Sequence, residues 1–130
     1  MSYKTLAILA ADLAKSKKIS PIEAWQITAQ KIFPNSLSSQ VKACPKNTFL
    51  GLCEAGMLDG IPAGKYTGSA LNKMYALIAV ELLLHNTVLP ITSRELWKET
   101  LRACDVDGSK VYNYQMDVVL GLWENGLINI

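Results

Sequence analysis

Apolar residues recur along the chain at intervals of three and four, the spacing of one face of an α-helix. In the first stretch Leu6, Leu9, Ala10 and Leu13 keep this spacing, which predicts a helix over about residues 4–16. The same pattern, with its start and stop signals, predicts further helices at about residues 21–33, 45–55, 70–85, 93–104 and 114–125. The chain is therefore expected to be mainly α-helical.

The hydrophobic pattern occurs twice. The phrase LGLCEAGMLDGI at 50–61 matches LGLWENGLINI at 120–130. Upstream, ISPIEAW (19–25) matches ITSRELW (91–97), and LAILAADLA (6–14) matches YALIAVELL (75–83). Each half then has the order helix, helix, helix, short strand. We expect two tandem repeats, residues 1–68 and 69–130, packed as one compact domain.

Polar residues mark the expected helix starts. Ser20 and Thr92 each stand three residues before a glutamate, Glu23 or Glu95. This is the capping-box pattern, in which the hydroxyl and the glutamate bond to each other's backbone N–H groups. Ser69 is expected to cap the helix that starts at residue 70.

Glycines mark the expected helix ends and one further feature. Gly56 and Gly126 follow the third helix of each half and suit the left-handed conformation that closes a helix. The segments that follow, MLDGI (57–61) and LINI (127–130), are predicted to pair as a short two-stranded ribbon that joins the repeats.

Gly51 and Gly121 lie inside the third helix of each half, at matching positions. A glycine inside a helix costs about 1 kcal/mol relative to alanine, so its occurrence twice at one place indicates a close approach. The favoured interpretation is a helix of the other repeat; a partner chain or a ligand stays open.

Two resemblances follow from these phrases. The segment ITSRELWKETLRACDVDGSKVYNYQMDVVLGLWENGLI (91–128) resembles the core of a winged helix-turn-helix domain, which implies winged-helix-like repeats. The second copy has no hairpin wing, and the first offers only the loop at 59–69. The phrases SSQVKACPKNTFLGLCEAG, GIPAGKYT and NYQMDVVLGLWENGLI resemble those of an uncharacterised family of small bacterial proteins. That resemblance implies a bacterial, soluble protein, but it does not imply any particular activity.

Composition narrows the setting. Half of the 130 residues are apolar and 18% are charged, as in a globular protein. No apolar run is long enough to span a membrane, and the N-terminal stretch is interpreted as an amphipathic helix and not a signal peptide. Three cysteines without framework spacing fit a reducing compartment, so a cytoplasmic location is expected.

The net charge of +2 is unevenly distributed. Residues 1–73 carry nine lysines and four acidic residues, giving +5, whereas residues 74–130 carry four basic and seven acidic residues, giving −3. Only the first half can attract a polyanion. The candidate nucleic-acid or anion contacts are Lys42, Lys46, Asn47 and Lys65. The first half holds no arginine, and the matching helix of the second half is acidic, which weighs against this function.

The cysteines offer one candidate thiol. Cys44 stands before Pro45, between Lys42 and Lys46, where it is expected to cap the third helix and where thiolate is favoured. Cys53 and Cys104 align with large apolar residues and are expected to be buried packing residues. The spacing does not suit zinc, and no metal or cofactor is expected.

Three classes of function therefore stay open. The leading hypothesis is a non-enzymatic protein-interaction or regulatory module, because nearly every distinctive residue is explained by packing or capping. In this hypothesis the partner is another protein or a second copy of the chain, and binding to a membrane is not expected. The alternatives are a nucleic-acid-binding protein that uses the basic first repeat, and a thiol-dependent enzyme that uses Cys44.

Overall fold

The computed structural model describes residues 2–85 and 91–129. Its helices are α1 (Tyr3–Lys17), α2 (Pro21–Ile32), α3 (Leu37–Gln40), α4 (Ala43–Glu54), α5 (Ala70–His85), α6 (Ser93–Ala103) and α7 (Gln115–Glu124). The described residues are thus mainly helical, as predicted, and every long helix falls close to its expected range. The four-residue α3 was missed, because so short a segment carries no helical periodicity.

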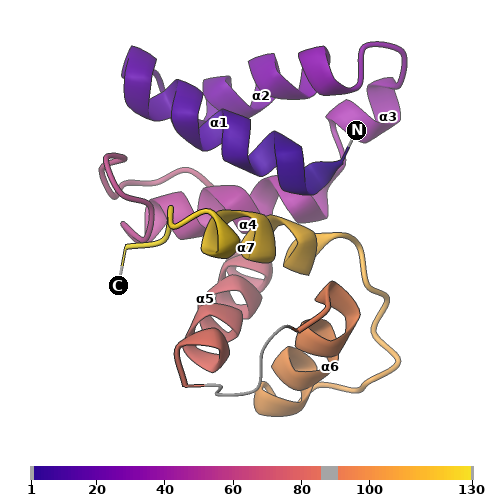
Figure 1. Ribbon diagram of the computed structural model, residues 1–130. Helices are drawn as coiled ribbons and strands as arrows, with labels where there is room; N and C mark the ends of the chain where they lie inside the picture. The colour runs from indigo at the N-terminus through magenta and orange to yellow at the C-terminus, as the bar shows by residue number, and fades with distance from the viewer. Residues whose placement is uncertain (1, 86–90, 130) are drawn as a thin grey trace.

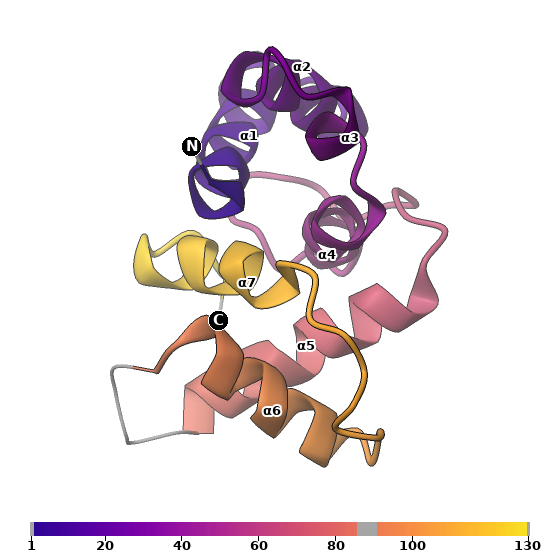
Figure 2. The same cartoon turned by 90° about the vertical axis from the view of Figure 1, so that its right-hand side faces the viewer.

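The helices form three tiers, with α4 and α7 in the middle (Figure 1). The pair α1 and α2 lies on one side of them and the pair α5 and α6 on the other; the view in Figure 2 shows the same order from the side. Helix α4 packs on α5 and α7, and α7 packs on α1, α5 and α6 as well. Buried side chains from both halves form one hydrophobic cluster, and its largest fully buried members include Trp25, Phe49, Tyr75, Leu96 and Met116.

Each central helix is touched by the first helix of the other half. A Cβ atom on Gly51 of α4 would lie 2.7 Å from Cα of Lys73 on α5. A Cβ atom on Gly121 of α7 would lie 2.7 Å from Cγ and 2.9 Å from the carbonyl oxygen of Lys4 on α1. Only glycine leaves room for helices this close, so the predicted helix-on-helix approach is confirmed.

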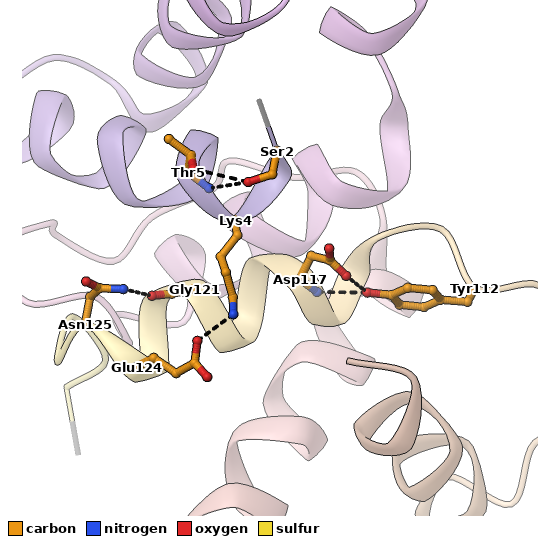
Figure 3. Close-up of polar contacts among 8 residues, drawn as sticks. All are labelled: Ser2, Lys4, Thr5, Tyr112, Asp117, Gly121, Glu124 and Asn125. Carbon is orange, nitrogen blue, oxygen red and sulfur yellow. Dashed lines mark hydrogen bonds and ion pairs between the residues drawn. The ribbon is translucent and has the colours of Figure 1, made fainter. Parts of the chain in front are cut away.

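An ion pair lies beside each glycine. Nζ of Lys4 is 2.6 Å from Oε1 of Glu124 (Figure 3), and Nζ of Lys73 is 2.8 Å from Oε2 of Glu54. The two lysines stand two residues before the matched stretches LAILAADLA and YALIAVELL, and the two glutamates share one position in the repeated phrase. The same contact is therefore made twice, and each time it joins one half to the other.

The segments that follow the two glycine-ended helices also meet. Leu58 and Ile128 form an isolated antiparallel bridge. Its flanking hydrogen bonds run from the N–H of Asp59 to the carbonyl of Leu127 (3.3 Å) and from the N–H of Asn129 to the carbonyl of Met57 (2.6 Å). The predicted pairing is therefore present between the described residues of these segments.

The prediction of two short strands was wrong: within residues 2–85 and 91–129 the pairing is this single bridge. The chain leaves the bridge at once, because Gly60 has a φ of 81° and the N–H of Ile61 donates to the carbonyl of Leu58. This turn prevents a second pair of residues from joining the ladder. Ile130 lies outside the described residues.

One of the two predicted capping boxes is present. Oγ1 of Thr92 accepts from the N–H of Glu95 at 3.1 Å, and the carboxylate of Glu95 accepts from the N–H of Thr92 at 3.3 Å. At the start of α2 the prediction was wrong, since Oγ of Ser20 accepts from the N–H of Ile22 instead of that of Glu23. The hydroxyl of Ser20 still caps the helix, but without the reciprocal glutamate bond.

Three further predicted helix boundaries are confirmed. Gly56 and Gly126 have φ values of 74° and 68° and close α4 and α7 in the left-handed conformation. Oγ of Ser69 accepts from the N–H of Asn72 at 3.2 Å and so caps α5.

Replacing Gly51 with alanine is expected to destabilise the protein by about 1–2 kcal/mol. The added methyl group would overlap the backbone of α5, and overpacking of about 1–3 kcal/mol outweighs the helix preference of alanine. Urea denaturation followed by circular dichroism measures the change. Gly108→Ala is the control, since a Cβ atom there meets no described atom within 4 Å. Equal stability of the two variants would contradict the close approach.

Candidate functional site

The basic residues singled out in the sequence are spread from the start of α4 to the loop that follows it. Lys42 is the residue before α4, and Lys46 and Asn47 lie near the start of this helix. Lys65 is exposed in the next loop, and the residue after it donates its N–H to Glu54, the last residue of α4. The twelve residues of α4 span about 18 Å, so Lys42 and Lys65 lie toward opposite ends of the helix.

The third helix of each half, which reads DNA in winged-helix proteins, is largely covered here. In α4 the residues from Thr48 to Cys53 are buried, and in α7 so are Gln115, Met116 and the residues from Val118 to Leu122. Asn47 is already engaged, since its Oδ1 accepts the hydroxyl of Thr67 at 2.8 Å. Nucleic-acid binding through Lys42, Lys46, Asn47 and Lys65 stays a prediction, and a titration at low salt can test it.

Cys44 does not cap α4, contrary to expectation. The helix begins one residue earlier, at Ala43, and its N-cap is Lys42. Cys44 is half-buried in the first turn. The histidine of the chain, His85, ends α5 and lies 2.9 Å from Glu81. The described structure therefore does not provide Cys44 with a histidine base.

The other two cysteines differ in burial. Cys53 is fully buried in α4, as predicted, and burial raises the pKa of its thiol. Cys104 is half-buried at the end of α6, so its predicted full burial was wrong; partial burial still raises the pKa of its thiol. A raised pKa favours the protonated thiol, which is the less nucleophilic form.

Glu54 holds a loop against the start of α5. Its Oε1 accepts from the N–H groups of Tyr66 (2.9 Å) and Thr67 (3.2 Å), and its Oε2 faces Nζ of Lys73. The Glu54 side chain is only 16% exposed. The bond from Lys73, followed by the two backbone N–H groups, lowers the pKa of Glu54 from 4.5 to about 2. Glu54 is thus a carboxylate at neutral pH, and its contacts fix the loop.

A cavity of about 460 Å³ lies between this fixed loop and α5. Glu54, Thr67 and Lys73 line its polar end, and Met74, Leu77 and Ile78 supply its apolar wall. The volume falls within the range of about 300–1,000 Å³ that is usual for ligand sites. Because the Glu54 carboxylate anchors the loop, the loop wall of this cavity is held in place by the fold.

The apolar wall continues along the outside of α5. Leu71, Met74 and Leu84 are 45%, 39% and 40% exposed, and Leu77 and Ile78 are half-buried between them. We call these five residues the α5 stripe. Their spacing places them along one side of the helix. The sequence did not reveal this surface, because α5 carries apolar residues on all its sides and periodicity then does not distinguish the outward face.

The α5 stripe is absent from the matching helix of the first half. The residues of the first half that correspond to Leu71, Met74 and Leu84 are Ser2, Thr5 and Lys15. The two halves thus share buried positions and differ in their outer surfaces. The exposed Glu81, paired with the exposed His85, lies within the span of the stripe, so the apolar surface is interrupted by one polar pair. The exposed apolar side chains on either side of this pair make α5 a candidate contact surface.

Within the described parts of the chain, no three His, Cys, Asp or Glu side chains are placed to hold a metal ion. Among the same residues, no helix is both long and apolar enough to cross a membrane.

The fold and the site define a small helical protein with two crossed helix contacts and an exposed apolar face on α5. The chain belongs to a family of unknown function, DUF6979, whose model matches residues 1–129. The expected membership of an uncharacterised family is therefore confirmed. Neither the curated proteins nor the solved structures include a match to the chain.

Replacing Glu54 with glutamine is expected to lower the melting temperature at neutral pH and to change its pH dependence. The pKa of Glu54 is lowered in the folded state, so its stabilising effect is full above about pH 4.5 and is lost as the pH falls toward about 2. Thermal unfolding from pH 7 to pH 2 should show a shallower acid decline for Glu54→Gln than for the unaltered protein.

Glu124→Gln is the matched control for this experiment. It removes the corresponding ion pair, whose side chains are more exposed, and among the described residues the Glu124 carboxylate accepts no backbone N–H. The control should therefore lose less stability at neutral pH. Parallel acid declines of Glu54→Gln and the unaltered protein would contradict the anchoring role of Glu54.

Proposed function

We propose that the protein is a non-enzymatic interaction module whose α5 stripe receives an amphipathic helix of a partner protein. The observation that carries this proposal is the exposed stripe itself, which continues into the cavity beside Lys73 and Glu54. Apolar anchors at intervals of three, four and seven residues are typical of helix-in-groove recognition.

We also infer that the chain consists of two winged-helix-like three-helix repeats that lack the wing. The reciprocal contacts of Gly51 with Lys73 and of Gly121 with Lys4 support this inference, since they join matching positions. In a duplicated scaffold the shared residues maintain the fold, and residues that differ are available for function. The α5 stripe belongs to the second group.

The size of the stripe favours a helical segment over a second copy of the chain. From Leu71 to Leu84 it measures about 20 Å along the axis, and a helix is about 10 Å wide. Its footprint is therefore on the order of 200 Å², well below the roughly 800 Å² per partner of a standard stable interface. A single amphipathic helix of about three to four turns matches this length.

The charge around the α5 stripe indicates which polar residues the partner helix carries beside its apolar face. Residues 74–130 carry four basic and seven acidic residues, a net charge of −3. Glu81 lies within the span of the stripe and is 66% exposed. Lys73, at the other end, is already paired with Glu54. A partner helix with basic residues beside its apolar face is therefore favoured.

The partner can be sought with a photo-reactive amino acid placed at Met74. Irradiation in cells that express the protein, followed by mass spectrometry, should yield a cross-link to a helical segment with basic flanks. The control position is Val111, which is 80% exposed and lies in the loop before α7. Cross-links that do not differ between the two positions would contradict the proposal, and a cross-link to the protein itself would replace it with self-association.

Binding by the identified segment should then depend on the stripe. Leu71→Ser, Met74→Thr and Leu84→Lys together install the residues of the first half, and all three positions are exposed enough to leave the fold intact. We expect affinity at least about tenfold lower, because each apolar side chain contributes up to about 1 kcal/mol when its exposed part is buried. Val111→Thr should bind as the unaltered protein does in isothermal titration calorimetry, and equal affinity of the triple variant contradicts the proposal.

A further inference from the structure

A second pocket, of about 230 Å³, lies at the ends of α1, α4 and α7 where these helices begin. Its lining includes Tyr3, Phe33 and Tyr114, together with Lys42 and Asp117. It is separate from the α5 stripe and independent of the function proposed for that surface.

Aromatic rings form one wall of this pocket. The ring of Tyr3 lies 5.0 Å from that of Phe33 and 4.9 Å from that of Tyr114, measured between centroids. Tyr3 is buried, and its hydroxyl donates to the carbonyl of Ser39 at 2.8 Å, which fixes its ring. Tyr114 is 44% exposed, so its ring is accessible to a ligand. Such a wall offers stacking and edge contacts to a further aromatic ring.

Tyr114 is held in an unfavourable backbone conformation. Its φ of 67° lies in the left-handed region, which costs a bulky side chain about 1–2 kcal/mol. The residue precedes α7, a position where glycine or asparagine would be less strained. A strained, exposed tyrosine beside a pocket is the kind of outlier that indicates function.

The pocket also carries one charge of each sign. Among the described residues Lys42 belongs to no ion pair within 4 Å, and α4 starts beside it without a side-chain cap. Both features favour an anion at this side. Asp117 accepts the Tyr112 hydroxyl with Oδ1, as Figure 3 shows. Its second carboxylate oxygen is left to accept from a ligand.

We propose that this pocket binds a free aromatic amino acid. The ring lies against Tyr114, the carboxylate faces Lys42, and the ammonium group faces Asp117. The volume is below the roughly 300 Å³ at which sites for drug-sized ligands begin, so it suits a single-ring molecule. A nucleotide would bring excess negative charge toward Asp117, whereas a zwitterion matches both charges.

Isothermal titration calorimetry with L-phenylalanine tests this site on the full chain. Phenylalaninamide lacks the carboxylate, 3-phenylpropionate lacks the ammonium group, and L-leucine lacks the ring. Each should bind about tenfold more weakly than L-phenylalanine, because one charged hydrogen bond or one ring contact is lost. The absence of a binding heat for L-phenylalanine up to its solubility limit overturns the proposal, as does equal affinity for all four compounds.

Two variants locate the site. Tyr114→Gly removes the ring and relieves the backbone strain, so the fold should be retained while binding is lost. Lys42→Met should weaken L-phenylalanine binding about tenfold and leave phenylalaninamide binding unchanged. Lys98→Met, on the exposed side of α6, is the control and should bind normally. Unchanged binding by Tyr114→Gly and Lys42→Met, with their fold confirmed by circular dichroism, overturns the assignment to this pocket.

Discussion

The fold depends on the close crossing of α4 with α5 and of α7 with α1. At each crossing a glycine removes the side chain that would separate the helices, and a lysine of the approaching helix pairs with a glutamate one turn further on. Both crossings join the two halves, because each half places its first helix against the third helix of the other half; α5 also packs on α7 of its own half. The apolar faces of α4 and α7 are therefore buried only when the whole chain is assembled, which makes one hydrophobic cluster out of two similar sequences.

Much of this fold could be predicted from the sequence, because the residues that determine the helix boundaries act locally. Helical periodicity, the hydroxyl residues that cap α5 and α6, and the glycines that end α4 and α7 set the boundaries without reference to the rest of the chain. The mid-helix cost of Gly51 even predicted a close approach. Contacts between distant segments decide which helix approaches Gly51. They also decide which face of that helix stays exposed to solvent. The outward face of α5 and the short α3 therefore escaped prediction.

The candidate sites were less predictable for the same reason. The sequence offers Lys42, Lys46 and Lys65 as candidate contacts for nucleic acid or an anion, but the length of α4 separates the first from the last. The aromatic pocket joins residues from the start of the chain and from the loop before α7, more than a hundred positions apart. No local pattern encodes such a meeting. The positive φ of Tyr114 and the exposure of the α5 stripe become visible only in three dimensions.

Helix α4 links the two candidate sites. Lys42 at its start faces the aromatic pocket, and Glu54 at its end fixes the wall of the α5 cavity. Binding at one site can affect the other only through a change in a shared element that both ligands bias. Side-chain rearrangement within α4 is restricted, since its residues from Thr48 to Cys53 are buried and Gly51 meets the backbone of α5. A coupling between the sites would therefore require α4 and α5 to shift together as one packed unit. If these helices stay in place, the two sites bind their ligands independently.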